Sequence, residues 1–190
     1  MELIKADDLE ERSALPWPYV AILLVEVLGL GGLAAVSLAR PPMTYEMGWA
    51  GCGSMLVMQL YSVRRRLRAL RDLGSLRAWL DAHVFFGLQG FVLVAYHSIG
   101  ISPNASLAAV NFALVATVVL TGLIGRYLYS LIHRARVRAA GRSITRASRI
   151  AALGAAERWL SRWTLLHRPL AILLLAITTL HVLAHFAYAA

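Results

Sequence analysis

The chain has 190 residues, 59% of them hydrophobic, a mean hydropathy of +0.64 and a net charge of +9. Soluble domains are about 45–50% apolar, and here the excess lies in long blocks, which is typical of a membrane protein. The arginines cluster between these blocks, which argues against nucleic acid as a partner. The single cysteine, Cys52, excludes an intrachain disulfide, a cysteine-ligated zinc or iron–sulfur cluster and covalently attached c-type heme.

Five apolar blocks are long enough to cross a bilayer, which takes about 20 residues of helix. The sequence therefore predicts one all-α domain over residues 1–190, a multi-pass transmembrane helix bundle of about five spans in contact with the lipid bilayer. The second block is the weakest because it contains Glu46 and three glycines, although glycines in membrane helices often mark close packing. The predicted spans are residues 16–39, 44–63, 79–98, 106–132 and 165–188.

The first block follows an acidic leader, so we do not expect a cleaved signal peptide, which would begin with basic residues. Glu26 stands in the middle of this block, where a charge facing lipid is costly. Two interpretations are equally good at this point. Glu26 either relays protons to a quinone or forms a hydrogen bond inside the bundle.

Arginine positions predict the orientation. Residues 64–78 and 133–164 are dense in arginine, whereas the loops on the other side carry only Arg40. The positive-inside rule therefore places the two basic loops and the N-terminus in the cytoplasm, and the C-terminus outside, across a cytoplasmic (inner) membrane. Residues 142–163 fit an amphipathic helix on the inner leaflet or, as we favour, a plain basic loop.

Four histidines recur with one spacing in the third and fifth spans. His83 and His97 are fourteen positions apart, and so are His167 and His181. Fourteen residues of helix rise about 21 Å and complete close to four turns. Each pair therefore lies on one face of its helix, at opposite sides of the hydrocarbon. Because a single span separates the two helices, they run parallel and bring the histidines to two matching levels.

Facing histidines at each level indicate two b-type hemes, held non-covalently with imidazole at both axial positions. We expect His83 and His167 to ligate a heme iron near the cytoplasm. We expect His97 and His181 to ligate an outer heme iron, with His185, one turn further on, as the alternative to His181.

Small and basic residues near the histidines fit the same interpretation. Gly87 and Gly90 leave room for a flat macrocycle on the third span. Arg126, Arg162 and Arg168 are expected at the cytoplasmic ends of their helices, where heme propionates accept charge-assisted hydrogen bonds.

Histidine pairs with thirteen residues between them, on the third and fifth spans of a bundle with two basic cytoplasmic loops, resemble the ferric reductase-like transmembrane domain. That domain is the diheme core of NADPH oxidases and ferric reductases. The cytochrome b of quinol-oxidising bc complexes has similar spacing, and GLIGRYLYSLIHR (122–134) looks like the end of the fourth helix in bacterial cytochrome b relatives. The resemblance covers roughly residues 40–188. It implies that the four paired histidines are heme ligands.

The sequence also departs from this family. The family core usually has a sixth span and often a C-terminal flavin and nicotinamide module, and neither is expected here. No G-x-G-x-x-G motif lies between a strand and a helix. We therefore expect a separate redox subunit, a flavoprotein or an iron–sulfur protein, on the basic cytoplasmic face.

The leading hypothesis is transmembrane electron transfer by a diheme cytochrome b subunit of an oxidoreductase, with a quinone or an extracytoplasmic acceptor as the other partner. One alternative is a small transporter or proton-conducting protein that uses intramembrane His and Glu without heme. A transporter that binds bare metal ions ranks lowest, because ligands about 21 Å apart on one helix cannot share an ion.

Overall fold

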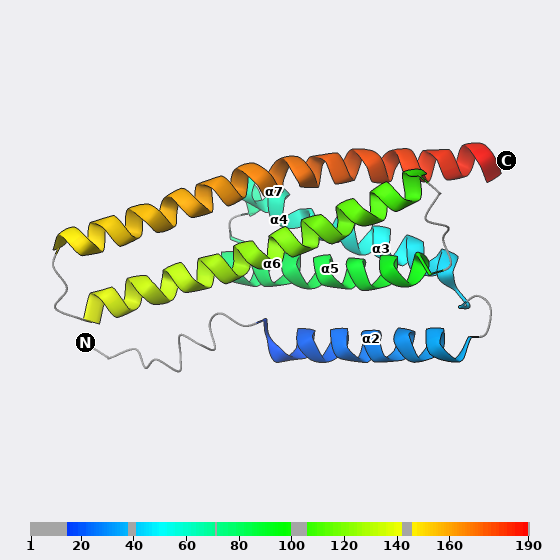
Figure 1. The fold of residues 1–190 in the computed structure, drawn as a ribbon, viewed down its shortest axis with the longest axis horizontal. Coiled ribbons are helices and arrows are strands. Elements are labelled where there is room, and N and C mark those ends of the chain that lie inside the picture. Colours follow the sequence, from blue (N-terminus) through cyan, green and yellow to red (C-terminus); the bar gives the residue numbers. More distant parts are fainter. Residues whose placement is uncertain (1–14, 38–40, 71, 100–105, 142–145, 190) are drawn as a thin grey trace.

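The computed structural model describes residues 15–37, 41–70, 72–99, 106–141 and 146–189, and it contains helices and no strands within these ranges (Figure 1). The short helical pieces α4 and η1 connect the two longer helices α3 and α5. In chain order the elements are α2 (Trp17–Val36), α3 (Thr44–Met58), α4 (Leu60–Arg66), η1 (Arg68–Leu70), α5 (Leu76–His97), α6 (Ser106–Gly141) and α7 (Arg146–Ala189).

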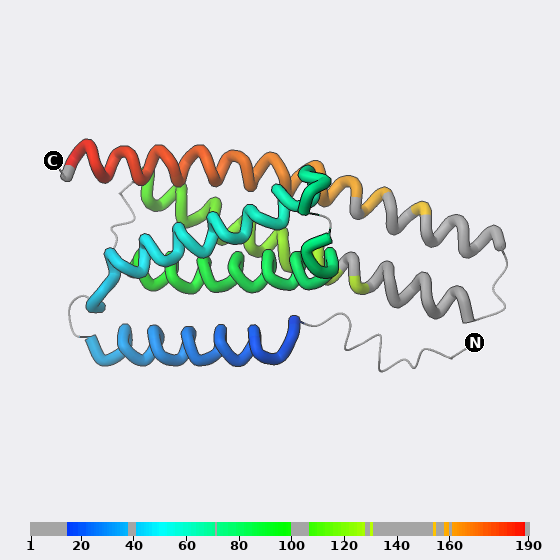
Figure 2. The backbone as a smooth tube through the Cα atoms, turned by 180° about the vertical axis from the view of Figure 1, so that it is seen from behind, coloured from blue at the N-terminus to red at the C-terminus, as the bar shows by residue number. Residues whose placement is uncertain are grey.

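Helices α3, α5, α6 and α7 form a four-helix arrangement, and α2 packs outside it against α5. Seen from opposite sides, α6 crosses one face of the bundle and α3 crosses the other (Figures 1 and 2). The extensive helix pairs are α3 with α5 and α6 with α7. Helices α5 and α7 run in the same direction and lie at opposite corners of the four-helix arrangement. Helix α5 packs mainly on α3, α7 packs mainly on α6, and α6 also contacts α5.

Four helical segments are long and apolar enough to cross a membrane: Trp17–Val36, Leu76–His97, Leu107–Tyr127 and Ser161–Tyr188. This confirms the prediction of an all-α, membrane-spanning protein whose apolar helices are suited to lipid. The predicted span 44–63 is not among the four segments. It forms α3, which has 15 residues, and then α4, because the helix is interrupted at Gln59.

Glycines bring α3 and α5 close together. A Cβ atom added at Gly90 would lie 2.9 Å from Met55 Cγ and 3.3 Å from the Gly51 carbonyl oxygen. One added at Gly87 would lie 3.1 Å from Met58 Sδ. Small residues at a contact let two membrane helices approach closely and gain van der Waals contact. In the structure, Gly87 and Gly90 therefore serve helix packing, and their predicted place beside a macrocycle stays a prediction.

The turn before α5 is held by a buried arginine. Arg64 is 7% exposed, its guanidinium donates to the Leu73 and Gly74 carbonyls at 3.4 and 2.7 Å, and it lies over the Trp79 ring at 5.7 Å. Gly74 has φ +69°, a conformation that favours glycine. Ser75 then caps α5 by accepting the first-turn N–H of Ala78 at 3.2 Å. These contacts set where α5 begins.

The second basic segment, predicted as a plain basic loop over 133–164 between two spans, has helical backbone in its described residues, and its place in the cytoplasm stays a prediction. Helix α6 continues to Gly141, and α7 begins at Arg146 and runs without interruption to Ala189. Alanine and arginine, which dominate this segment, have high helix propensity, so charge ends the apolar span without ending the helix. The described part is therefore also not a separate amphipathic helix. Residues 142–145 lie outside the described ranges.

Candidate functional site

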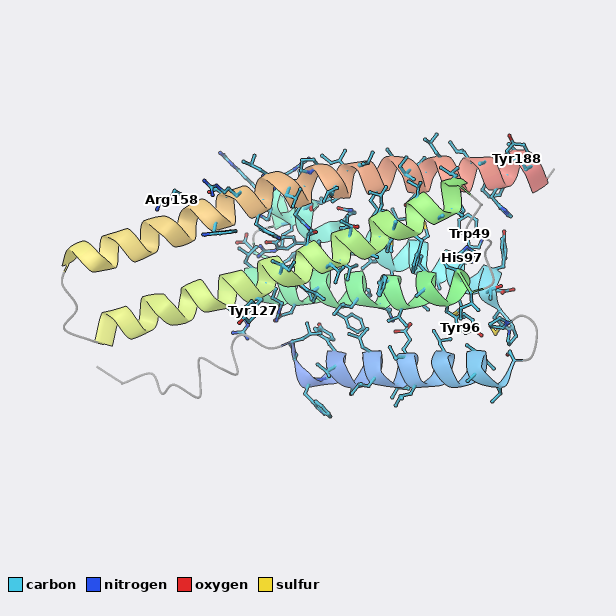
Figure 3. All side chains as sticks on the ribbon, viewed as in Figure 1. Trp49, Tyr96, His97, Tyr127, Arg158 and Tyr188 are labelled. Carbon is cyan, nitrogen blue, oxygen red and sulfur yellow. The ribbon has the colours of Figure 1, made fainter. Side chains whose placement is uncertain are left out.

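The four paired histidines are brought together across the bundle as the spacing predicts. His83 and His97 lie on α5, and His167 and His181 lie on α7. His167 lies near enough to His83, and His181 near enough to His97, for the imidazoles of each pair to influence each other electrostatically. We call His83 and His167 the first histidine level, and His97 and His181 the second histidine level. Figure 3 shows His97 at the end of the bundle where Trp49 and Tyr188 also lie.

The interruption between α3 and α4 gives His83 its hydrogen-bond partner. The Ser62 N–H donates to the Gln59 carbonyl at 2.9 Å, which tightens the chain there and leaves the Met58 carbonyl for another donor. His83 Nδ1 lies 3.0 Å from that oxygen. Tyr61, one turn along, places its ring 5.2 Å from the imidazole. The break in the predicted second span therefore orients this histidine.

A glycine on α3 admits the ring of His97. His97 Nδ1 lies 2.7 Å from the Thr44 carbonyl oxygen, in the first turn of α3. A Cβ atom at Gly48 would lie 2.7 Å from that same Nδ1 and 2.9 Å from the ring carbon Cε1. Because no side chain larger than glycine fits between the ring and the helix, Gly48 is what allows the imidazole to reach the carbonyl.

His167 is anchored to α6 and not to α3. Its Nδ1 lies 2.9 Å from Thr121 Oγ1, whose hydroxyl donates to the Val118 carbonyl at 2.9 Å. A hydroxyl both donates and accepts, so Thr121 Oγ1 can bond the Val118 carbonyl and His167 Nδ1 together. The Trp163 ring stacks on the imidazole at 5.1 Å and donates its indole N–H to the Thr121 carbonyl at 2.6 Å. The Trp163 ring also lies against Gly125, where an added Cβ atom would collide with the ring.

Two of these contacts fix the tautomer of an imidazole. A backbone carbonyl can only accept, so Nδ1 carries the proton in His83 and His97, and the lone pair of each neutral ring is then on Nε2. In His167 the Thr121 hydroxyl engages Nδ1 in the same way, which leaves Nε2 as the other ring nitrogen. Metal-bound histidines commonly donate their other ring N–H to a carbonyl in this way. The donor set thus fits a metal approached through Nε2.

His181 is held differently from the other three. It is half-buried, and no hydrogen bond joins it to the residues that the structure describes. Both His97 and His185 are near enough to influence it electrostatically. His185 itself is exposed and is surrounded by aromatic rings, Tyr45 at 5.4 Å and Phe186 at 5.9 Å. The structure therefore keeps His185 against the start of α3 and leaves His181 opposite His97.

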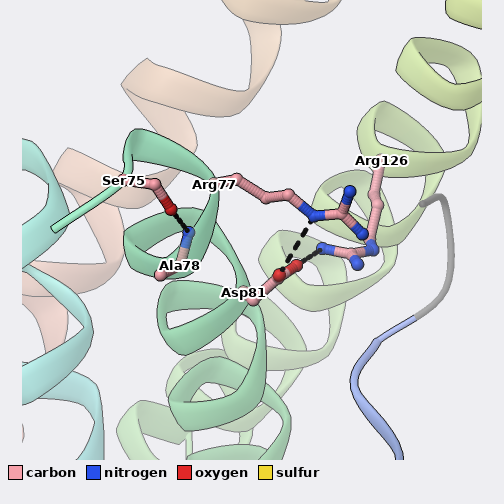
Figure 4. A network of polar contacts seen from close by, with 5 residues as sticks. All are labelled: Ser75, Arg77, Ala78, Asp81 and Arg126. Carbon is pink, nitrogen blue, oxygen red and sulfur yellow. Dashed lines mark hydrogen bonds and ion pairs between the residues drawn. The ribbon is translucent and has the colours of Figure 1, made fainter.

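Arg126 is engaged by a carboxylate. Its guanidinium lies 2.9 Å from Asp81, which is 5% exposed and lies 3.7 Å from Arg77 as well (Figure 4). A buried charge is tolerated when it is paired, so this pair joins α5 to α6 close to the first histidine level, at a position two residues before His83. Arg162 and Arg168 are exposed. The predicted propionate contacts of these arginines stay predictions.

Several residues that build the site escape sequence reasoning. They position the histidines from neighbouring helices through carbonyl groups, a hydroxyl, an indole ring and the absence of side chains. A cue exists only for the glycines, since Gly48 and Gly51 recur at helical spacing on α3. The residues missed are Thr44, Gly48, Met58, Thr121, Gly122, Gly125 and Trp163.

The described residues include no cluster of side chains suited to a bare metal ion. Over the described ranges, no group of three or more His, Cys, Asp or Glu side chains could hold a metal ion.

Comparison with protein-family models, with curated proteins and with solved structures finds no match to this chain. The case for a ligand at the histidines therefore depends on their own geometry and chemistry.

Proposed function

We propose that this chain is a transmembrane cytochrome b subunit that holds two b-type hemes and mediates electron transfer across the membrane. The observation that carries the proposal is that Nδ1 of His83, His97 and His167 is in each case hydrogen-bonded to a neighbouring helix, which leaves Nε2 available. Imidazoles prepared in this way from two diagonal helices, at two levels, suit bis-histidine ligation. A transporter without heme would give no comparable reason for imidazoles oriented in this way at two matching levels.

The residues of each level have distinct tasks. His83 and His167 would hold the inner heme, and His97 and His181 the outer one. A bound heme supplies a one-electron carrier whose potential depends on its axial ligands and burial. The Met58 and Thr44 carbonyls and the Thr121 hydroxyl keep the rings oriented and raise the basicity of their Nε2 atoms. Because two histidines would hold each heme, the residues of this chain would support electron transfer and not the binding of a substrate at the metal.

Five spans suit the helix arrangement. Residues 44–66 of α3 and α4 together extend about 35 Å at 1.5 Å per residue, which is enough to cross the hydrocarbon. They carry the chain back between α2 and α5, which run in the same direction (Figure 1). The N-terminus would then be cytoplasmic and the C-terminus outside, in an inner membrane.

Exposed arginines favour an electron-transfer partner on the cytoplasmic side. Arg65, Arg66 and Arg68 follow the end of α3 and are exposed, as are Arg158 and Arg162 on α7 (Arg158 is labelled in Figure 3). Such a surface attracts an anionic partner and speeds its encounter. The partner proposed is a separate flavoprotein or iron–sulfur subunit. The second partner is a quinone or an extracytoplasmic acceptor.

A reduced-minus-oxidised visible spectrum of the purified protein, with heme quantified as pyridine hemochrome, tests the proposal. We expect two b-type hemes per chain. One heme would mean that one histidine level is structural. A monodisperse, helical preparation without heme, expressed with heme supplied, would overturn the proposal in favour of a transporter or proton-conducting protein.

A further inference from the structure

An open groove lies between α2 and α5, away from the histidine contacts. Its volume is about 360 Å³, and it is lined by Ala21, Ile22, Val25 and Glu26 of α2 and by Gln89 of α5. Small-molecule sites commonly measure about 300–1,000 Å³, with apolar walls and a few polar groups. The groove between α2 and α5 likewise has apolar walls, with Glu26 and Gln89 as its polar groups. The proposed electron-transfer function assigns no role to its polar residues.

The polar residues of the groove are joined to α3 by hydrogen bonds. Ser54 on α3 places its hydroxyl 2.8 Å from the Phe86 carbonyl and 3.2 Å from Gln89 Oε1. The Gln89 side chain also hydrogen-bonds Glu26. The other carboxyl oxygen, Glu26 Oε2, is buried and has no hydrogen-bond partner among the described residues.

The position of this carboxyl group in the membrane makes the missing partner significant. Glu26 is the tenth residue of the 20-residue helix α2, and Gln89 lies between His83 and His97 on α5. Both are therefore near the middle of the hydrocarbon. A polar group without a partner is unfavourable there. A ligand that brings a hydrogen-bonding group to this depth would remove that penalty.

Few molecules can do so. Phospholipid head groups stay at the interface, about 15 Å from the bilayer centre, and acyl chains carry no hydrogen-bonding group. A lipid-soluble quinone or quinol combines an apolar body with ring oxygens that accept or donate hydrogen bonds. We infer that the α2–α5 groove binds the head group of such a quinone, with Glu26 and Gln89 as its hydrogen-bonding partners. The choice of a quinone rests on the proposed electron-transfer function.

Photo-crosslinking in lipid nanodiscs tests the site without relying on heme. The probe is an aryl-azide derivative of a short-chain ubiquinone, and the labelled residues are mapped by mass spectrometry. We expect label on residues 21–26 and near Gln89, reduced about tenfold by excess decylubiquinone. Label spread evenly over lipid-facing helices, or not displaced by decylubiquinone, would overturn the inference.

Variants identify the polar partners. Glu26→Leu and Gln89→Leu should each lower specific labelling about tenfold, the factor expected when one hydrogen bond in an apolar site is lost. Glu26→Gln keeps a hydrogen-bonding group and should retain labelling within about twofold. The matched control is Leu28→Ala, on the same helix at a position 72% exposed and outside the groove, which should not change it. Equal labelling of all four variants would contradict the assignment.

Heme content measured on the same preparations separates this inference from the proposed function. Specific, displaceable label on a protein without heme would leave the groove as a quinone site and remove the electron-transfer proposal. Two hemes per chain with label that decylubiquinone does not displace would keep the electron-transfer proposal and remove the quinone site.

Discussion

The two histidine levels have the same spacing in sequence but different surroundings. In the first histidine level, both imidazoles are anchored through Nδ1, and each has an aromatic ring beside it, Tyr61 or Trp163. In the second histidine level, only His97 is anchored, and another imidazole, His185, lies one turn from His181. The first level is thus the more preorganised. Equal spacing therefore does not give the two levels equal surroundings, and the two hemes of the proposed function should differ in affinity and redox potential.

The largest expected effect is the loss of one heme when one level is broken. His83→Ala should reduce heme from two per chain to one by removing the inner heme, and His97→Ala should do the same for the outer heme. Each substitution removes an axial ligand from one iron only. Pyridine hemochrome quantification and low-temperature spectra would measure which component disappears. Retention of both hemes in either variant would contradict the pairing.

A smaller effect, confined to the second histidine level, is expected for Gly48→Ala. The added Cβ would lie 2.7 Å from His97 Nδ1 and push the ring off the Thr44 carbonyl. Overpacking of this kind costs about 1–3 kcal/mol, so the outer heme should be lost about tenfold more readily to a heme-binding acceptor protein. The matched control is Gly53→Ala on the same helix, where a Cβ meets nothing within 4 Å. An equal effect of both substitutions would rule out this explanation.

The corresponding test of the first histidine level is Thr121→Val, which keeps the side-chain shape and removes the hydroxyl that bonds His167 Nδ1. A less basic imidazole stabilises ferric iron less, so the midpoint potential of the inner heme should rise. About 60 mV corresponds to a tenfold change for one electron, and loss of such a partner commonly changes metal affinity about 10–100-fold. Potentiometric titration would measure the shift.

Thr117→Val provides the control for that titration. Thr117 lies one turn earlier on α6, is exposed and donates its hydroxyl to the Ala113 carbonyl at 2.7 Å. The substitution removes the same kind of hydroxyl without touching a histidine. A shift as large as that of Thr121→Val would show that the change is general to α6.

The smallest effect is expected for His185→Ala. Because His185 is held against Tyr45 and Phe186, both hemes and their spectra should persist. His181→Ala, by contrast, should lose the outer heme. Loss of the outer heme in His185→Ala, with both hemes kept in His181→Ala, would make His185 the ligand in place of His181. It would also show that the second histidine level rearranges around its cofactor.

Local periodicity made much of this protein predictable. Hydropathy indicated the membrane helices, and the fourteen-residue spacing placed each histidine pair on one helix face, because 3.6 residues per turn is a property of a single segment. The same reasoning gives less where two local signals differ, as in the second basic segment. Arginines after Tyr127 end the apolar span, but the same residues continue the α6 helix to Gly141.

The sequence by itself therefore determined the helical membrane class and the position of each histidine pair on one face of its helix. Only the tertiary structure decided what holds their rings. The partners of His83 and His97 are carbonyl groups of Met58 and Thr44, and every residue has a carbonyl, so no residue type marks them in the sequence. The unpartnered oxygen of Glu26 is likewise visible only once Gln89 and Ser54 are packed beside it. Spacing is fixed along one helix, whereas a hydrogen-bond partner is fixed by how helices pack.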